Sequence, residues 1–344
     1  MELTKNKYEI MSPVGSWESL AAAIQGKADS IYFGVEGLNM RARSSHNFTT
    51  DDLHKIAETC HENGMKSYLT VNTIIYDEDL STMKQIVDAA KEVGISAVIA
   101  ADVAAMTYAR SNEMEVHLST QVNISNIEAL KFYAQFADVA VLARELNLEQ
   151  VARINARIQS ENICGPNGKP LRMEMFCHGA LCMAVSGKCY LSLHEMAASA
   201  NRGACMQLCR RSYSVKDNES NIEFTVDNQY IMSPKDLKTI HFINKMIDAG
   251  VEVFKIEGRA RGADYVRTVT ECYREAAEAC QKNEFTPEKV ADWDARLKTV
   301  FNRGFWNGYY LGQRLGEWSA NYGSQASKTK VYVGKGIKYF SQLG

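Results

Sequence analysis

Short apolar runs alternate with amphipathic stretches along most of this chain. Eight of the runs have the length and the β-branched or apolar composition of buried strands. They are Tyr8–Met11, Ser30–Phe33, Lys66–Val71, Ala97–Ala101, Glu115–Ser119, Val139–Leu142, Arg172–Phe176 and Val251–Ile256. Strands that alternate with helices form parallel sheets, and eight such units favour closure. The pattern therefore predicts an α/β fold of the (β/α)8 TIM-like barrel type.

The stretches between these runs carry helical periodicity. We expect helices at Thr50–Asn63, Asp79–Val93, Ser125–Phe136 and Leu148–Gln159, with two more, Ala263–Lys282 and Pro287–Val300, after the eighth strand. Thr49, Asn123 and Asn147 are the predicted N-caps, and Gly64 and Gly94 the predicted helix ends. These helices would form the outer ring of the barrel.

The alternation breaks once, after the seventh strand. Residues 177–236 form a cysteine-rich insertion whose polar stretch Lys216–Glu223 has the composition of a hairpin or a loop. The tail Thr329–Phe340 has the pattern of a strand pair around a glycine turn, and a lone hairpin is marginally stable. We therefore predict a barrel over 1–325 and, over 326–344, the beginning of a truncated β domain or a tail.

Composition and charge narrow the class of function. The 344 residues are 46% apolar and carry a formal net charge of −2, so any RNA contact must come from a local basic patch. The first residues lack the apolar core of a signal peptide, and no run approaches the roughly 20 apolar residues of a membrane span. We expect a cytoplasmic protein with no membrane contact, in which nine cysteines favour metal binding or reactivity over disulfides.

In (β/α)8 barrels the functional side chains follow the carboxyl ends of the strands. That rule selects Ser12, Asn39, Arg41, Arg43, Asn72, Asp102, Gln121, Asn123, Arg144, Glu145, Glu174, His178, Glu257 and Arg259. From this set we predict catalytic roles for His178, Glu174 and Glu257, and substrate binding by Arg41, Arg43, Asn72, Gln121, Arg144 and Arg259. For any single member the alternative is solvation or helix capping.

Four cysteines inside the insertion form the predicted metal site. Cys182, Cys189, Cys205 and Cys209 have the spacing C-x6-C-x15-C-x3-C, whose first interval is wider than in most structural zinc sites. Four thiolates suit a [4Fe–4S] cluster, and nearby basic residues would offset its negative charge. Zinc, or small thiols without metal, are the alternatives. Cys177 is a spare ligand, a nucleophile or a buried thiol.

Several motifs in order along the chain resemble the collagenase-like peptidase family U-32. They include Glu174-x-Phe176-x-His178-Gly179-Ala180-x-Cys182-x6-Cys189, His117-x-Ser119-x-Gln121, Arg144-Glu145-Leu146 and Lys255-Ile256-Glu257-Gly258-Arg259. Ser12-Pro13-x-Gly15, Ala28-Asp29-x-Ile31-Tyr32 and Met232-Ser233-Pro234-Lys235-Asp236-Leu237 extend the resemblance over most of the chain.

Within that family the chain is most similar to the branch of prephenate-dependent tRNA wobble-uridine hydroxylases. The resemblance implies an oxygen-independent enzyme that forms 5-hydroxyuridine with a [4Fe–4S] cluster, on tRNA bound through a local basic patch or a further β domain. Prephenate would be the small dicarboxylate co-substrate, which arginine forks recognise well. The alternatives are a peptidase, for which neither a His-Glu-x-x-His nor a Gly-x-Ser-x-Gly motif is present, and a non-catalytic iron–sulfur accessory protein that binds RNA.

Overall fold

A computed structural model describes residues 8–42, 47–220, 223–224, 228–313 and 315–328. The predicted tail strands at 329–340 and the predicted substrate-binding residue Arg43 lie outside the described residues. No helix among those described is long and apolar enough to cross a membrane.

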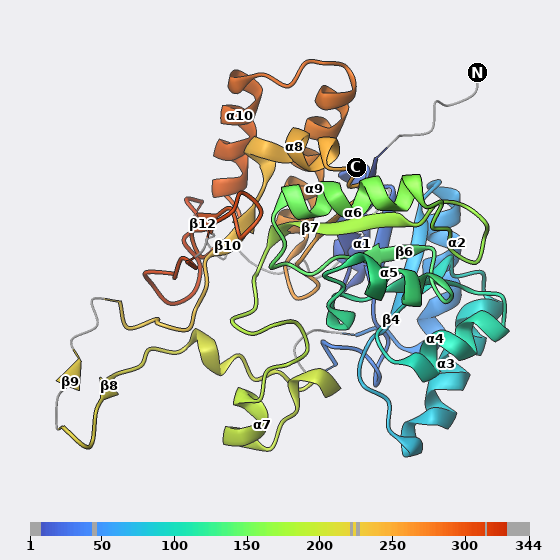
Figure 1. Cartoon of the computed structure of the whole chain (residues 1–344), viewed down its shortest axis with the longest axis horizontal. Helices are drawn as coiled ribbons and strands as arrows, with labels where there is room; N and C mark the ends of the chain where they lie inside the picture. Colours follow the sequence, from blue (N-terminus) through green and yellow to red (C-terminus); the bar gives the residue numbers. More distant parts are fainter. Residues whose placement is uncertain (1–7, 43–46, 221–222, 225–227, 314, 329–344) are drawn as a thin grey trace, which may run out of the picture.

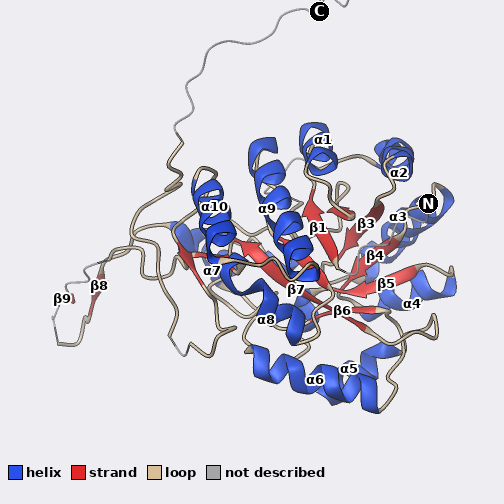
Figure 2. Ribbon diagram, turned by 90° about the horizontal axis from the view of Figure 1, so that it is seen from above, coloured by secondary structure: helices blue, strands red, loops and turns tan. Residues whose placement is uncertain are grey.

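Eight parallel strands close into a barrel, as predicted (Figure 2). They are β1 (Glu9–Pro13), β2 (Ser30–Phe33), β3 (Lys66–Val71), β4 (Ala97–Ala100), β5 (Glu115–Leu118), β6 (Val139–Val141), β7 (Arg172–Gly179) and β11 (Val253–Ile256). Each strand pairs with the next in order, and β11 closes the ring because it pairs with both β7 and β1. The carboxyl ends of all eight strands therefore meet at one rim.

Helices surround this barrel and bury their apolar faces against it. They are α1 (Trp17–Gln25), α2 (Leu53–Glu62), α3 (Leu80–Glu92), α4 (Val103–Ser111), α5 (Ile127–Ala134), α6 (Leu148–Ser160), α8 (Ile243–Asp248) and α9 (Ala263–Gln281), with α10 (Pro287–Lys298) outside α9. Asn147 caps α6 as predicted, since its side chain accepts from the Gln150 N–H. Gly64 and Gly94 follow helix ends with positive φ, also as predicted.

The predicted cap Asn123 is wrong. The side chain of Asn126 caps α5 instead, by accepting from the Ala129 N–H. Asn123 lies in the left-handed region at φ 57°, and its amide donates to the Ser186 carbonyl oxygen at 3.0 Å. A tertiary contact to the insertion thus replaces the local capping contact.

The strand β7 is three residues longer than the predicted Arg172–Phe176. Its last residues pair with the antiparallel strand β10 (Asp236–Lys238), which pairs in turn with β12 (Phe305–Trp306). Between β7 and β10 the chain makes its long excursion, which contains α7 (Leu191–Met196) and the hairpin of β8 (Val215–Lys216) with β9 (Glu223–Phe224). Figure 1 shows α7 at the bottom of the view and the β8–β9 hairpin at its left edge, apart from the barrel strands.

Candidate functional site

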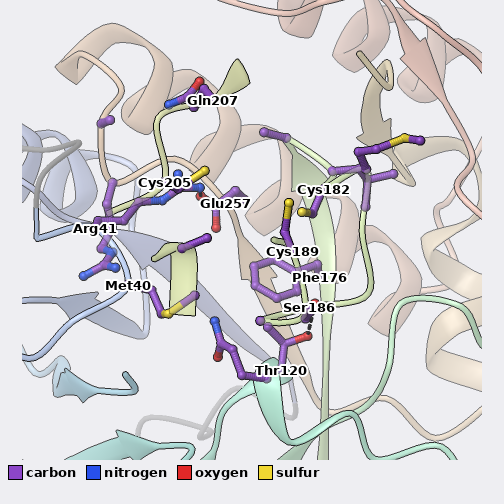
Figure 3. Close-up of a pocket in the computed structure, with 18 of the residues that line it drawn as sticks. Met40, Arg41, Thr120, Phe176, Cys182, Ser186, Cys189, Cys205, Gln207 and Glu257 are labelled. Atoms are coloured by element: carbon purple, nitrogen blue, oxygen red, sulfur yellow. Dashed lines mark hydrogen bonds and ion pairs between the residues drawn. The ribbon is translucent and has the colours of Figure 1, made fainter. Parts of the chain in front are cut away.

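A cavity of about 210 Å³ lies at the carboxyl rim of the barrel, beneath the insertion (Figure 3). Tyr32, Phe176 and Lys255 from three barrel strands line it, together with residues of the long excursion. Figure 3 shows Arg41, Met40 and Glu257 on the barrel side and Cys182, Cys189 and Cys205 on segments of the insertion. The barrel and the insertion therefore build one site.

The cavity is basic although the whole chain is slightly acidic. Glu257 is the acidic residue that lines it, against seven basic residues: Arg41, Arg144, Arg210, Lys255, Arg259, Arg261 and Arg303. Counting charges at neutral pH, seven positive groups and one negative group leave +6 before the cysteines are considered, compared with −2 for the chain. Such a concentration of guanidinium groups favours ligands that carry carboxylates or phosphates.

Glu257 is held as a carboxylate by its basic neighbours. Arg41 donates to Glu257 Oε1 at 2.7 Å. Burial by itself raises the pKa of Glu257, but the positive charges of Arg41, Arg144 and Arg259 outweigh it and hold that pKa below its ordinary value. The side chain is therefore ionised at neutral pH and orients Arg41 within the cavity.

Arg259 lies almost completely buried on the β2 and β3 side of the cavity. Its Nη1 donates to Asn39 Oδ1 at 3.1 Å and to Thr70 Oγ1 at 2.9 Å. Burial lowers the pKa of Arg259 to about 10, so the guanidinium still carries its charge near neutral pH. Both partners are neutral, and the positive charge remains available to an anionic ligand.

Arg144 approaches the cavity from the end of β6. Its guanidinium carbon lies 3.8 Å from the centre of the Phe176 ring, and Nη1 donates to the Ala180 carbonyl oxygen at 3.3 Å. The buried Nε has no hydrogen-bond partner among the described residues. A buried donor without a partner is costly, so this atom is a natural contact for a ligand oxygen.

Neutral polar groups complete the rim between β3 and β5. Asn72 Nδ2 donates to Ser119 Oγ at 3.2 Å and to Gln121 Oε1 at 3.4 Å, and its Oδ1 accepts from the Met40 N–H. All of these residues line the cavity. The predicted binding residues Asn72 and Gln121 are thus brought together with Arg41, Arg144 and Arg259.

The four predicted metal-ligand cysteines also line this one cavity. Cys182 follows β7, Cys189 precedes α7, and Cys205 and Cys209 lie near the short 3-10 helix Leu208–Arg210. All four are free thiols with some solvent exposure. Burial raises the pKa of Cys209, and the positive charge of Arg210 lowers it. Negative charge on the other three cysteines would raise this pKa further, because four neighbouring thiolates repel one another. A cationic metal core among them would relieve this repulsion.

The arrangement of these cysteines bears on which metal centre fits. A zinc ion needs its ligands about 2.3 Å from one centre. Among the described residues, no three Cys, His, Asp or Glu side chains converge closely enough to hold a single ion. Four cysteine thiolates are the donor set of a [4Fe–4S] cluster, and all four side chains line the same cavity.

Arg210 anchors the cysteine segment to the barrel side. Its guanidinium donates to the Ser233 hydroxyl at 3.1 Å, to the Pro234 carbonyl at 2.8 Å and to the Leu181 carbonyl at 2.5 Å. One side chain next to Cys209 thus fixes the residue before Cys182 and the segment that leads into β10. The segments that carry Cys209 and Cys182 are therefore joined through this guanidinium.

Two predicted catalytic residues lie away from the cavity lining. Glu174 is fully buried inside the barrel, where its Oε1 accepts from Lys255 Nζ at 2.6 Å. His178 faces outward, because Phe176 pairs with Lys255 whereas His178 pairs with the next residue, Ile256, so Cys177 forms a bulge. The bulge reverses the side on which His178 lies, and its ring packs against Tyr273 at 5.6 Å between ring centres.

This outward position fixes the protonation state of His178. Burial lowers its pKa to about 3, so the ring is neutral at physiological pH. His178 therefore does not line the cavity in which we predicted its proton-transfer role. Cys177 beside it is a buried thiol that donates to the Lys255 carbonyl oxygen, and burial raises its pKa well above the ordinary value.

The remaining strand-end candidates have local roles. Ser12 Oγ shares a hydrogen bond with Thr270. The Asp102 carboxylate accepts from the Ala104 N–H at the start of α4 and from the Ile75 N–H in the loop after β3. Glu145 lines a small adjoining pocket beside Trp318. Ser12 thus makes a packing contact and Asp102 caps α4.

The sequence-based choice omitted Lys255. This residue lines the cavity, is 4% exposed and places its ammonium 4.6 Å from the centre of the Tyr32 ring. Lys255 and Glu257 are two residues apart, so their side chains lie on the same face of the strand. Two charged residues at alternate positions of an otherwise apolar strand were the signal that could have identified Lys255. Arg210, one of the basic residues beside the cysteines, is partly buried and also lines the cavity.

Comparison with known proteins agrees with this architecture. The chain is 68% identical over 339 residues to a collagenase of Porphyromonas gingivalis, covering 98% of this chain and 82% of the relative. It is 32% identical to tRNA hydroxylation protein P1 of Bacillus subtilis, covering 97% and 78%. It is 33% identical to the 23S rRNA 5-hydroxycytidine C2501 synthase of Escherichia coli, covering 81% and 40%.

The sequence model of peptidase family U32 matches residues 15–320, which include every barrel strand from β2 onward and the whole cysteine insertion. The predicted resemblance is therefore confirmed, and the chain belongs to peptidase family U32.

Proposed function

We propose that this protein is an oxygen-independent RNA hydroxylase that forms 5-hydroxyuridine at the wobble position of tRNA, with prephenate as co-substrate and a [4Fe–4S] cluster on Cys182, Cys189, Cys205 and Cys209. One observation carries the proposal: the four cysteines and seven basic side chains share one cavity at the barrel rim. Relatives that hydroxylate tRNA or rRNA support the reaction class.

The basic cavity provides the support for a dicarboxylate. Arg259 and Arg144 approach from different strands, and neither pairs with a carboxylate in the described structure. Two separated guanidinium groups match two carboxylates on one small ligand, and each bidentate contact fixes an orientation as well as a charge. Asn72 and Gln121 add neutral amide groups for hydroxyl or carbonyl oxygens of the same ligand.

The cysteine set fits a cluster through its donor chemistry and its surroundings. When bound, the cluster would supply a redox-active iron site next to the ligand. Arg210 would hold the cysteine segments in place and offset thiolate charge, and Phe176 would keep one wall of the cavity free of water. A wobble uridine lies in a single-stranded loop, so presenting its base to the rim requires little unpairing.

The alternative is a peptidase, as the printed name of the Porphyromonas relative says of that protein. A cysteine peptidase needs a thiol activated by an adjacent base. Cys177 has a raised pKa and donates to a carbonyl oxygen, while His178 is neutral and packs against tyrosines. This pair is therefore unsuited to nucleophilic catalysis, which favours the hydroxylase.

Metal content provides the first test. Protein purified without oxygen should be brown and contain about four iron and four sulfide per chain. Cys205→Ser should lose most of both, while Cys280→Ser, a change at a cysteine of α9 outside the cavity, should retain them. Colourless protein with bound zinc would reject the cluster.

Nucleoside analysis provides the second test. Total tRNA from a strain that lacks this gene should lose 5-hydroxyuridine and its derivatives when digested and measured by mass spectrometry, and a plasmid copy should restore them. Arg259→Met in the plasmid copy should restore much less. An unchanged nucleoside profile, together with cleavage of gelatin by the purified protein, would favour the peptidase.

A further inference from the structure

A line of titratable side chains runs through the barrel interior from the cavity to the opposite end. It begins at Lys255 in the cavity and continues through Glu174 and His117, which are both fully buried, to Glu115. The side chain of Glu115 is 36% exposed near the amino end of β5. These four residues come from three strands, β11, β7 and β5, and all face the barrel axis.

The distances along this line are short. Lys255 Nζ lies 2.6 Å from Glu174 Oε1, Glu174 Oε2 lies 3.9 Å from His117 Nδ1, and His117 Nε2 lies 3.0 Å from Glu115 Oε1. Each of the two buried members uses one atom toward one neighbour and its other atom toward the next. The middle interval is the only one of the three longer than a hydrogen bond, and a closure of about 1 Å would make it one.

The two atoms that face each other across this middle interval are otherwise unsatisfied. Glu174 Oε2 and His117 Nδ1 have no hydrogen-bond partner among the described residues. A buried polar atom without a partner is unfavourable, so packing alone does not account for this pair of facing atoms. An apolar pair of similar size would fill the same space without that cost.

The other charged groups near these four residues are not members of the line. Glu9 from β1 accepts from Arg172 and from the Tyr68 hydroxyl, so these three residues satisfy one another. The Tyr68 ring lies 4.4 Å from the His117 ring between centres and fixes its plane. Lys66 and Asp138 contribute charge near the outer end of the line.

We propose that Glu115, His117, Glu174 and Lys255 form a proton relay that connects solvent at the amino end of the barrel with the ligand in the cavity. The inference rests on the proposed function for the identity of the ligand. Such a path supplies protons when an RNA loop covers the rim and separates the cavity from bulk water. Lys255 is the member that would touch the ligand.

The transfer involves protons alone. The Lys255 ammonium gives one proton to a basic atom of the ligand, which breaks an N–H bond and forms a bond to that atom. Glu115, once protonated from water, gives that proton to His117 Nε2 as the His117 Nδ1–H bond breaks and its proton passes to Glu174 Oε2, so the imidazole stays neutral and Glu115 returns to a carboxylate. A half-turn of the carboxyl group then lets Glu174 pass the proton to the Lys255 amine, which restores the ammonium and the Glu174 carboxylate within one turnover. No electron changes hands.

Two nearly isosteric substitutions interrupt the relay. Glu174→Gln retains an oxygen for Lys255, and His117→Gln retains a polar group of similar length, but neither passes a proton. Tyr68→Phe is the matched control, because it removes a buried hydroxyl contact to Glu9 beside the line and leaves the line intact. All three would be measured as cluster-loaded protein with thermal unfolding in parallel.

The kinetic result expected under single-turnover conditions is a loss of at least about 10-fold in the rate of product formation for Glu174→Gln and His117→Gln. The KM of both relay variants should stay within about twofold of the wild-type value. Tyr68→Phe should retain the wild-type rate. The solvent deuterium isotope effect should differ from that of the wild type in the relay variants alone. Relay variants that fold and keep the wild-type rate and isotope effect would overturn the proposal.

A spectroscopic measurement separates this failure from failure of the proposed function. In protein with 15N-labelled histidine, the His117 Nδ1 resonance should shift by several ppm in Glu174→Gln and much less in Tyr68→Phe. If wild-type protein shows no hydroxylase activity, the proposed function fails and the resonance still reports the Glu174 contact. An unresponsive Nδ1 resonance would show that the middle step does not exist.

Discussion

Gly203 holds the cysteine segment against the loop that carries Arg41, and Gly203→Ala tests this contact. Its φ of +83° lies in the left-handed region, where an alanine costs about 1–2 kcal/mol. A Cβ at this position would overlap the Asn39 carbonyl oxygen and lie 3.0 Å from the Ala42 Cβ. Backbone on both sides resists displacement, and overpacking adds about 1–3 kcal/mol. The combined cost is about 2–5 kcal/mol, concentrated where Cys205 follows.

Gly64→Ala is the matched control. Gly64 also has a positive φ, +65°, but nothing lies within 4 Å of the position that an alanine Cβ would take there, so this variant carries the backbone cost of about 1–2 kcal/mol alone. We expect Gly203→Ala to have reduced iron and sulfide and faster proteolysis within 180–212, with Gly64→Ala close to wild type in both. Equal iron content and equal proteolysis in the two variants would refute the reasoning.

Two further predictions concern pH. The pKa of His178 is about 3 in the folded chain and about 6.5 in the unfolded chain. As pH falls below about 6.5, the unfolded chain therefore binds a proton at this residue and the folded chain does not. Stability should fall by about 2 kcal/mol from pH 8 to pH 5, and His178→Phe should remove most of that loss in urea titrations. Burial raises the pKa of Glu9, but Arg172 and Tyr68 lower it to about 2, so its stabilisation is complete above about pH 4.5 and is lost as pH falls toward 2. The difference is worth about 3 kcal/mol, and Glu9→Gln should be less stable at pH 7 yet lose less between pH 4.5 and 2.5; a wild-type slope there would contradict the Glu9 assignment.

The barrel could be predicted because its information is local. Each strand is a short apolar run, each helix has its own periodicity, and Lys66–Val71 agrees with the observed strand at both ends. The extension of β7 could not be predicted, because it depends on pairing with β10. That strand has only three residues and lies more than fifty positions further along the chain. Strand pairing over such a separation leaves no pattern in either segment.

The residue types of the site could be predicted from the sequence, but the directions in which some of their side chains point could not. Arg41, Arg144 and Arg259 line one cavity, as the strand-end rule predicts, and the four cysteines predicted from their spacing in the insertion line the same cavity. The rule failed for His178 because one bulged residue, Cys177, reverses the alternation. Lys255 was missed because it lies within a strand rather than after one.

The pairing of β7 with β10 has an evolutionary consequence. Leu237 lies opposite Gly179, so the chain leaves and re-enters the barrel side within one hydrogen-bonded ladder. The residues between these two positions form an insertion. Its length does not affect the barrel, because the pairing of β7 with β11 does not depend on what the insertion contains. Selection can therefore lengthen, shorten or replace the insertion that lines the cavity, while the barrel strands keep their register.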